Sequence, residues 1–261
     1  MTTPDPLTFR RERLGPLDCL VLDGGNSPTI PVFILHGYGA NAEDLAGLAP
    51  AYVQSLGDQA KHFRFVFPNA PQSLEPLGMP GGWAWWPINM AGLMEAIEAK
   101  RFDQLHDQTP PGLSEASAAV SETMNIVFRQ MGLDGLAGDP DEPSREAPYV
   151  IGGFSQGAML AAEMSIVRTA VPPSLLLLYS GTLIRQNKWK PKLERLNRCR
   201  VFQSHGTADP ILPLSSATKL RDLIASRSID LDFVSFPGGH TIPPEAISKT
   251  VQMLAGVAPS D

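Results

Sequence analysis

Short runs of consecutive apolar residues recur along the chain and alternate with longer stretches in which apolar residues are three or four positions apart. The short runs have the length of β-strands. Several are apolar at every position, which is typical of strands buried on both faces of a parallel sheet. The pattern predicts strands over 17–22, 31–35, 64–67, 149–154, 174–179, 201–204 and 231–236.

The longer stretches have the spacing of amphipathic helices and contain many strong helix formers. Pro243 and Pro244 are suited to open a last helix, with Glu245 in its first turn. Because strands alternate with helices, we expect a mostly parallel sheet covered by helices on both sides, and we find no internal repeat. The expected helices are 44–56, 113–131, 156–168, 214–227 and one that begins at 243–244.

Two segments interrupt this alternation. Residues 135–148 (GLAGDPDEPSREAP) are rich in glycine, proline and acidic residues, which indicates a surface loop before a core strand. Residues 88–111 contain a short stretch of helical spacing. Two interpretations stay open for it, a helix packed on the sheet or a lid or pocket wall. Its apolar side comprises Met90, Leu93, Met94 and Ile97.

Composition narrows the class of protein without naming a partner. The length of 261 residues suits one large domain or at most two, and the single alternating pattern favours one domain over residues 1–261. A hydrophobic share of 43% is that of a globular protein. The formal charge of −6 argues against nucleic acid and anionic membranes as partners, because both select basic patches.

Cys19 and Cys199 each stand in a short apolar run, which favours buried free thiols in a reducing compartment. Neither belongs to a CxxC pair or a zinc-ligand spacing, so we expect no metal. The N-terminal segment carries charge with no apolar h-region behind it, and no stretch reaches the ~18 apolar residues of a membrane span. We therefore expect a cytoplasmic protein without integral membrane association.

The motif Gly153-Phe154-Ser155-Gln156-Gly157 lies between a predicted strand and a predicted helix. In this context G-x-S-x-G forms a nucleophile elbow. The serine of such a sharp turn has strained backbone dihedral angles, and side chains at positions −2 and +2 would clash. No other serine in the chain has glycine at both positions. Ser155 is therefore the candidate nucleophile of an α/β-hydrolase fold.

A serine nucleophile needs a general base, and in this fold the chain order is serine, acid, histidine. Two histidines follow Ser155. His240 stands after two glycines in a loop at the carboxyl end of a predicted strand, where parallel sheets present catalytic groups. His205 ends its own strand and is interpreted as a structural histidine. His240 is therefore the candidate base.

Asp209 is the candidate acid, because it stands in the loop HGTADPILP just beyond a predicted strand. The following proline restricts its backbone toward extended geometry. The alternatives are Asp222 inside a helix, Asp230 and Asp232 at the beginning of a strand, and Glu163 and Glu194.

An oxyanion hole requires two preorganised N–H donors. One is expected from Gln156, the residue after the nucleophile, and the other from Tyr38 in the glycine-containing loop 34–41.

Three tryptophans gather in GGWAWWP outside any strand pattern, either as core residues or as a pocket wall. Together with two residues of 88–111 they are candidates for the substrate pocket. This candidate set is Trp83, Trp85, Trp86, Met94 and Ile97.

Six motifs in order, LHGYGAN, FPNAP, GGWAWWP, GFSQGAML, HGTADPILP and GGHTIPPE, resemble the phospholipase/carboxylesterase family, which includes acyl-protein thioesterases and bacterial carboxylesterases. The resemblance runs from about Pro31 to near the C-terminus. It implies an α/β-hydrolase that acts on carboxylic esters or thioesters without a cofactor. Carried over by motif, it implies the triad Ser155, Asp209 and His240, with oxyanion donors Tyr38 and Gln156.

The chain also departs from this family's depalmitoylating members, which often carry HGxGD, because Ala40 and Asn41 follow Gly39 here. The segment 88–111 is longer than the resemblance leads us to expect. Both departures favour a bacterial-type carboxylesterase for small to medium acyl groups. A serine peptidase and an acyltransferase remain alternatives, because both also proceed through an acyl-enzyme. A non-catalytic binding protein of this fold is a further alternative.

Overall fold

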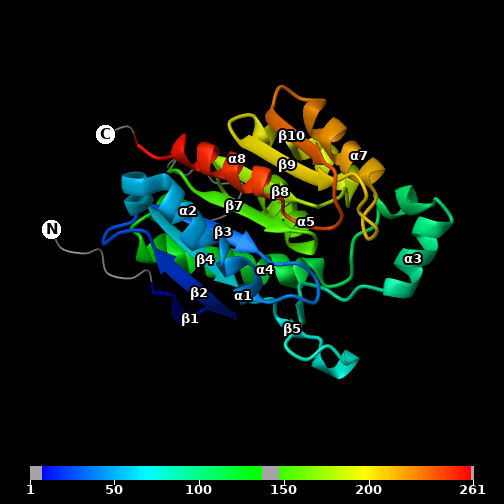
Figure 1. The fold of residues 1–261 in the computed structure, drawn as a ribbon, viewed down its shortest axis with the longest axis horizontal. Helices are drawn as coiled ribbons and strands as arrows, with labels where there is room; N and C mark the ends of the chain where they lie inside the picture. The colour runs from blue at the N-terminus through cyan, green and yellow to red at the C-terminus, as the bar shows by residue number, and fades with distance from the viewer. Residues whose placement is uncertain (1–7, 137–146, 260–261) are drawn as a thin grey trace.

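The computed structural model describes residues 8–136 and 147–259, and its centre is one mixed sheet (Figure 1). From β4 to β10 the neighbouring strands are parallel, while β2 is antiparallel both to β4 and to β1. The mostly parallel sheet expected from the sequence is confirmed. In spatial order its strands are β1 (Arg10–Leu14), β2 (Leu17–Asp23), β4 (Phe63–Pro68), β3 (Ile30–Leu35), β7 (Val150–Phe154), β8 (Leu175–Tyr179), β9 (Arg200–Gly206) and β10 (Asp230–Phe236).

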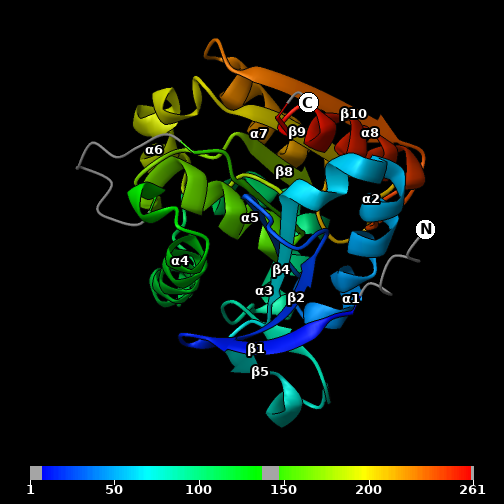
Figure 2. The same ribbon diagram turned by 90° about the vertical axis from the view of Figure 1, so that its left-hand side faces the viewer.

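Helices cover both faces of this sheet, as the expected fold requires (Figure 2). One face packs on α1 (Ala42–Ala46), α2 (Leu48–Leu56) and α8 (Pro244–Ala255). The other face packs on α4 (Leu113–Gln130), α5 (Gln156–Glu163), α6 (Gln186–Trp189) and α7 (Leu214–Ala225). Shorter helical turns are η1 (Gly57–His62), η4 (Asp134–Leu136), η5 (Met164–Arg168, which continues α5) and η6 (Lys190–Leu196).

Strand β8 explains why the core strands read as unbroken apolar runs. Leu176 and Leu178 lie in the core beneath α4 and α5, and Leu175, Leu177 and Tyr179 lie in the core beneath α2 and α8. All are fully buried, because successive side chains point to opposite faces and both faces are covered. Each leucine contributes about 1.5–3 kcal/mol through the apolar surface that it buries.

The structure differs from the sequence pattern at the edges. The expected helix 44–56 is two helices joined at Gly47, and the side chain of Asn41 caps the first of them. Strand β1 was not expected, because RRERL is an edge strand with charged and largely uncovered side chains. A small hairpin of β5 (Gln72–Ser73) and β6 (Trp83–Ala84) encloses η2 (Glu75–Leu77). Most of the expected loop 135–148 lies outside the described residues.

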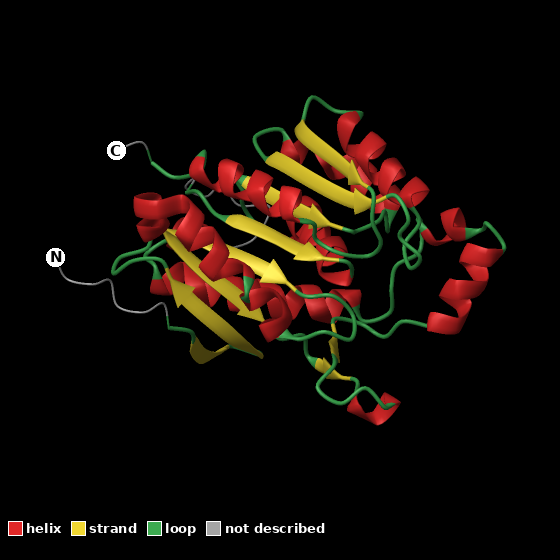
Figure 3. Cartoon of the chain, viewed as in Figure 1, coloured by secondary structure: helices red, strands yellow, loops and turns green. Residues whose placement is uncertain are grey.

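Residues 88–111, here called the cap, stand beyond the carboxyl end of the sheet (Figure 3). They form α3 (Met90–Glu98) and η3 (Phe102–Leu105), which pack on each other. No residue of α3 is fully buried, so α3 is not a helix packed on the sheet. Across the described residues, we find no helix with the length and apolar character to cross a membrane.

Candidate active site

Ser155 occupies a strained turn between β7 and α5. Its φ of 55° and ψ of −116° lie in a region that residues other than glycine rarely adopt. A Cβ on Gly157 would lie 2.0 Å from the carbonyl oxygen of Leu35, and one on Gly153 would lie 2.4 Å from the carbonyl carbon of Gly157. Both positions therefore require glycine. This close packing places Ser155 at the carboxyl edge of the sheet.

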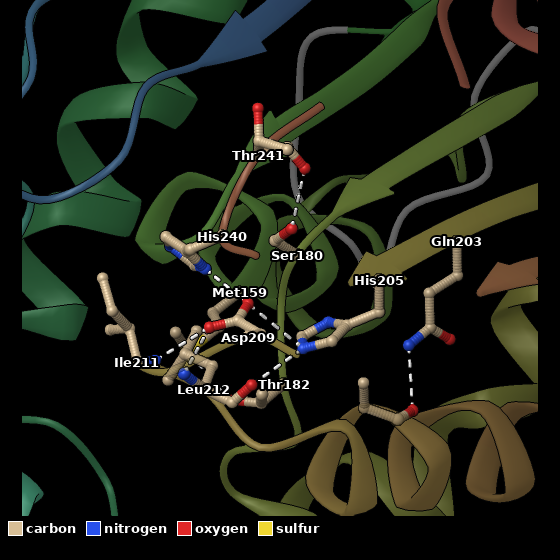
Figure 4. A network of polar contacts seen from close by, with 11 residues as sticks. Met159, Ser180, Thr182, Gln203, His205, Asp209, Ile211, Leu212, His240 and Thr241 are labelled. Carbon is tan, nitrogen blue, oxygen red and sulfur yellow. Dashed lines mark hydrogen bonds and ion pairs between the residues drawn. The ribbon is translucent and has the colours of Figure 1, made fainter. Parts of the chain in front are cut away.

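Asp209 and His240 meet at the same edge, although 31 residues separate them (Figure 4). The imidazole Nδ1 of His240 lies 2.6 Å from Asp209 Oδ2. The other carboxylate oxygen, Oδ1, accepts the N–H groups of Ile211 and Leu212, each at 2.9 Å. Burial acts to raise the pKa of Asp209, but the hydrogen bonds from His240 and Leu212 outweigh it and lower that pKa. Asp209 is thus held as a carboxylate.

Two hydrogen bonds hold the loop of His240, one from the loop of Asp209 and one from the side chain of Ser180 after β8. The N–H of Ala208 donates to the carbonyl oxygen of Gly238 at 2.9 Å, and the Ser180 hydroxyl donates to the carbonyl oxygen of Thr241 at 3.1 Å. The His240 ring packs on the ring of Phe154, with centroids 4.7 Å apart. The imidazole is thereby held beside the residue that precedes Ser155.

No hydrogen bond joins the Ser155 hydroxyl to His240 among the described residues. Catalytic hydrogen bonds are often loose without substrate and close in the complex. Because His240 Nδ1 faces a carboxylate oxygen, which only accepts hydrogen bonds, Nδ1 is the donor in this contact and Nε2 is the ring nitrogen that does not face Asp209. The geometry therefore orients the imidazole beside the residue that precedes the candidate nucleophile.

The backbone N–H groups of Tyr38 and Gln156 have no acceptor within the part of the chain that the structure describes. Gln156 is the first residue of α5, where N–H groups are free of helical partners. The loop of Tyr38 lies against Ser155, because a Cβ on Gly37 would lie 3.3 Å from Ser155 Cβ. Both expected donors are therefore unoccupied next to the candidate nucleophile.

A buried hydrogen-bond network holds these donors in place. The Gln156 side chain accepts from the Trp85 N–H at 2.9 Å and donates to the Trp86 carbonyl oxygen at 2.8 Å. The Trp85 indole N–H donates to the carbonyl oxygen of His36 at 2.8 Å, and His36 Nε2 accepts from the Ala70 N–H at 3.0 Å. The sequence pattern indicates only a backbone role for Gln156 and no role for His36. Their contacts are with residues far away in the sequence, so no local pattern indicates them.

An apolar cavity of about 430 Å³ opens beside the triad candidates and beneath the cap. Met159 lies one turn after Ser155 on α5, and Leu212 contacts Asp209, so the cavity adjoins the site. The cavity is lined from the cap by Ile88, Leu93, Phe102 and Leu105, and from the remainder of the protein by Trp86, Met159, Leu183, Ile184 and Leu212, among others.

The expected pocket residues do not share one place. Trp86 lines the apolar cavity, whereas Trp85 is fully buried in the core. Trp83 lines a different cavity of about 440 Å³ with many charged and polar side chains. Met94 and Ile97 are half-buried and lie outside the lining of the apolar cavity, because α3 turns the neighbouring Leu93 toward it instead. The structure thus brings one of the five expected residues to this cavity.

The second half of the cap is anchored to the rest of the protein. The buried His106 lies with Nε2 2.5 Å from the Ser216 hydroxyl of α7, and its carbonyl oxygen accepts the Gln186 N–H at 2.8 Å. Asp103 forms an ion pair with Lys219, also on α7. These contacts fix η3 over the cavity, while α3 rests on η3.

Comparisons with known proteins agree with this architecture. A family model described as Phospholipase/Carboxylesterase matches residues 19–257. An acyl-protein thioesterase 1 of Mycosarcoma maydis is 25% identical over 244 residues, which cover 90% of this chain and 94% of the relative. An acyl-protein thioesterase 1 of Kluyveromyces lactis is 26% identical over 232 residues, with 86% and 90% covered.

Solved structures resemble the fold. The crystal structure of esterase PE8 superposes with a TM-score of 0.71 at 21% identity and covers 92% of this chain and 99% of that one. A carboxylesterase from Mesorhizobium loti superposes with a TM-score of 0.65 at 17% identity, with 95% and 99% covered. At these identities the likeness concerns the fold alone.

Proposed function

The chain belongs to the phospholipase/carboxylesterase family of hydrolases, and we propose that it is a serine carboxylesterase that cleaves esters or thioesters of small to medium acyl groups. The observation that carries this proposal is the Asp209–His240 pair at 2.6 Å, beside a serine at a φ of 55°. The proposed chemistry needs no cofactor, and the substrate is a small molecule.

Ser155 is the nucleophile in this mechanism. Its Oγ forms a bond with the carbonyl carbon of the substrate while its proton passes to Nε2 of His240. Asp209 holds Nδ1 and stabilises the imidazolium. His240 then gives the proton to the departing alcohol or thiol, and an acyl-enzyme remains. Water, activated by the same histidine, cleaves the acyl-enzyme and returns Ser155 to its starting state.

The N–H groups of Tyr38 and Gln156 bind the oxyanion that forms when the carbonyl oxygen takes up charge. Within the described residues they have no other acceptor, and the network of His36, Trp85 and Gln156 holds them in advance. Preorganised donors cost no rearrangement during the reaction, and removing one such donor typically costs 10²–10³-fold in kcat.

The apolar cavity accommodates the acyl chain. The cavity of about 430 Å³ is far larger than the roughly 30 Å³ that one water molecule takes up in the liquid, so it has room for an acyl chain of several carbons. Each methylene that enters contributes about 0.8 kcal/mol, which is roughly fourfold in kcat/KM. The cap therefore sets the preferred chain length.

A serine peptidase or an acyltransferase would use the same triad, and the acceptor of the acyl group distinguishes them. Water gives hydrolysis, whereas an amine or alcohol acceptor gives transfer. A non-catalytic binding protein of this fold is disfavoured because Ser155, Asp209 and His240 are all in place. Labelling of Ser155 by a fluorophosphonate separates this last class from the enzymes.

The test is a hydrolysis screen of p-nitrophenyl esters and acyl thioesters from acetate to dodecanoate. Wild type should turn over a medium chain best. Ser155→Ala and His240→Ala should each lose on the order of 10⁶-fold in kcat, and Asp209→Ala somewhat less. Asp222→Ala, an exposed carboxylate on α7, is the matched control and should keep wild-type turnover. Turnover that survives Ser155→Ala would refute the proposal.

A further inference from the structure

His205 is a fully buried histidine that the proposed mechanism does not use. It lies at the carboxyl end of β9, and its ring contacts the turn that carries Asp209 (Figure 4). Its Nε2 lies 2.8 Å from the carbonyl oxygen of Leu212 and 3.4 Å from Asp209 Oδ2. The ring therefore touches both ends of the turn formed by residues 209–212.

The surroundings of the ring identify its proton. A carbonyl oxygen only accepts hydrogen bonds, so Nε2 of His205 carries the proton and donates it to Leu212. Nδ1 is buried and has no hydrogen-bond partner among the described residues, as fits an unprotonated nitrogen. Burial lowers the pKa of His205 below the ordinary value for histidine. The ring is accordingly a neutral donor that adds no charge beside the acid.

The backbone of Leu212 links this ring to Asp209. Its N–H donates to Asp209 Oδ1 at 2.9 Å, while its carbonyl oxygen receives the proton of His205 Nε2. With Oδ1 held in this way, Oδ2 is left to face His240 Nδ1 at 2.6 Å. The side chain of Leu212 also lines the apolar cavity. The buried N–H of His205 thus stabilises the position of Leu212, which in turn holds the Asp209 carboxylate and forms part of the cavity wall.

We propose that His205 is a positioning residue, which fixes the Asp209 carboxylate through the Leu212 backbone so that Oδ2 orients His240. This inference rests on the proposed function. If His205 acted only by packing, an apolar side chain of similar size would replace it without effect on turnover. A positioning donor instead requires an N–H near the place of Nε2, which glutamine supplies and leucine does not.

A double-mutant cycle between His205 and Asp209 tests this role, with kcat and KM measured on p-nitrophenyl butyrate. His205→Leu should lower kcat by on the order of 10²-fold and change KM by less than about threefold, because small displacements of a catalytic group carry losses of this size. In the Asp209→Asn background the same substitution should cost less than about threefold, because the carboxylate through which His205 acts is gone.

His205→Gln should raise kcat at least about tenfold above that of His205→Leu, because it restores the donor to Leu212. Gln203→Leu is the matched control. Gln203 is buried on the same face of β9 and donates to the Ala217 carbonyl oxygen at 2.9 Å, so its loss removes a buried hydrogen bond away from Asp209 and should leave kcat unchanged. If His205→Leu does not fold, His205→Asn replaces it in the cycle. The asparagine side chain is too short to reach the carbonyl oxygen of Leu212, so this variant also lacks the donor.

Independent, additive effects of the two substitutions would overturn the role of His205. Equal kcat values for His205→Gln and the variant without a donor would overturn it as well. If the Ser155→Ala variant and the Asp209→Asn variant each kept the turnover of wild type, the proposed function itself would be overturned. The failure of the proposed function is therefore distinguishable from the failure of the role of His205.

Discussion

His36 should make folding sensitive to acid. The residue is 1% exposed, and its Nδ1 donates to the carbonyl oxygen of Gly37 at 2.8 Å while its Nε2 accepts from the Ala70 N–H. A second proton on Nε2 would face the Ala70 N–H, which is itself a donor. Burial, the largest cause, lowers the pKa of His36 to about 4.

The size of the effect follows from this pKa. In the unfolded chain histidine takes up its proton near pH ~6.5, whereas folded His36 stays neutral down to about pH 4. Between these values the unfolded state binds more protons, so the free energy of unfolding falls as the pH falls. The full loss is roughly 3 kcal/mol, and about 2 kcal/mol of it lies between pH 7 and pH 5. This is a large part of the 5–15 kcal/mol that typically separates the folded from the unfolded state.

Urea unfolding at several pH values, followed by circular dichroism, measures this contribution. His36→Gln keeps an acceptor for the Ala70 N–H and does not titrate. His106 and His205, whose pKa values burial also lowers, are present in both proteins and cancel in the difference. Wild type should lose about 2 kcal/mol more than His36→Gln between pH 7 and pH 5. His62→Gln, at a half-buried position away from this loop, controls for the loss of one imidazole.

Parallel stability curves for wild type and His36→Gln over this pH range would refute the reasoning. If the free energy of unfolding fell more steeply with acid in His36→Gln than in wild type, the predicted sign of the effect would be wrong. If the prediction holds, acid acts on the loop that carries Tyr38, since His36 lies two positions before it.

Two further predictions concern the cap and the thiols. Leu93→Ser should lower the octanoate-to-acetate ratio of kcat/KM by roughly fourfold to fifteenfold, because one or two methylenes of the substrate lose their contact with the cavity wall. Met94 is the next residue on α3 and does not line the cavity, so Met94→Ser should change this ratio by less than about twofold. Equal ratios in both variants, or melting temperatures that fall together, would exclude this division of roles. Cys19 and Cys199 should not react with Ellman's reagent at pH 8 until the protein unfolds. Burial raises the pKa of the Cys19 thiol to about 12 and that of the Cys199 thiol still further, so neither is a reactive thiolate in the folded protein. Rapid reaction of the native protein with the reagent would contradict this prediction.

The arrangement of the sheet was predictable because each central strand carries its own evidence. Strands such as β8 are apolar on both faces, and the helices between them have a different period, so the alternation indicates a parallel sheet without any knowledge of contacts. Strand β1 and helix α6 escaped prediction because they are short and rich in polar or charged residues. They are stable only through their neighbours, which a local pattern does not contain.

The candidate triad was also visible in the sequence, and its catalytic role stays a prediction. Glycines at two fixed positions mark the turn of Ser155, and the order of elements restricts where the acid and the histidine can lie. The glycine spacing can be recognised as a motif, although the steric reason for it is partly tertiary, since a Cβ on Gly157 would meet the carbonyl oxygen of Leu35 in β3. The structure brings Asp209 and His240 into contact as that order implies.

The sequence by itself therefore determined the central strands, the family and the candidates for chemistry, since strand period, the G-x-S-x-G spacing and the order of elements can all be read along the chain. Only the tertiary structure decided which side chains surround that chemistry. The Gln156 side chain meets Trp85 across 71 residues, and His106 meets Ser216 across 110. Such contacts depend on how whole elements pack, because a rotation of α3 by one residue exchanges Leu93 for Met94 at the cavity. No pattern within a segment records that rotation, which depends on how α3 packs on η3.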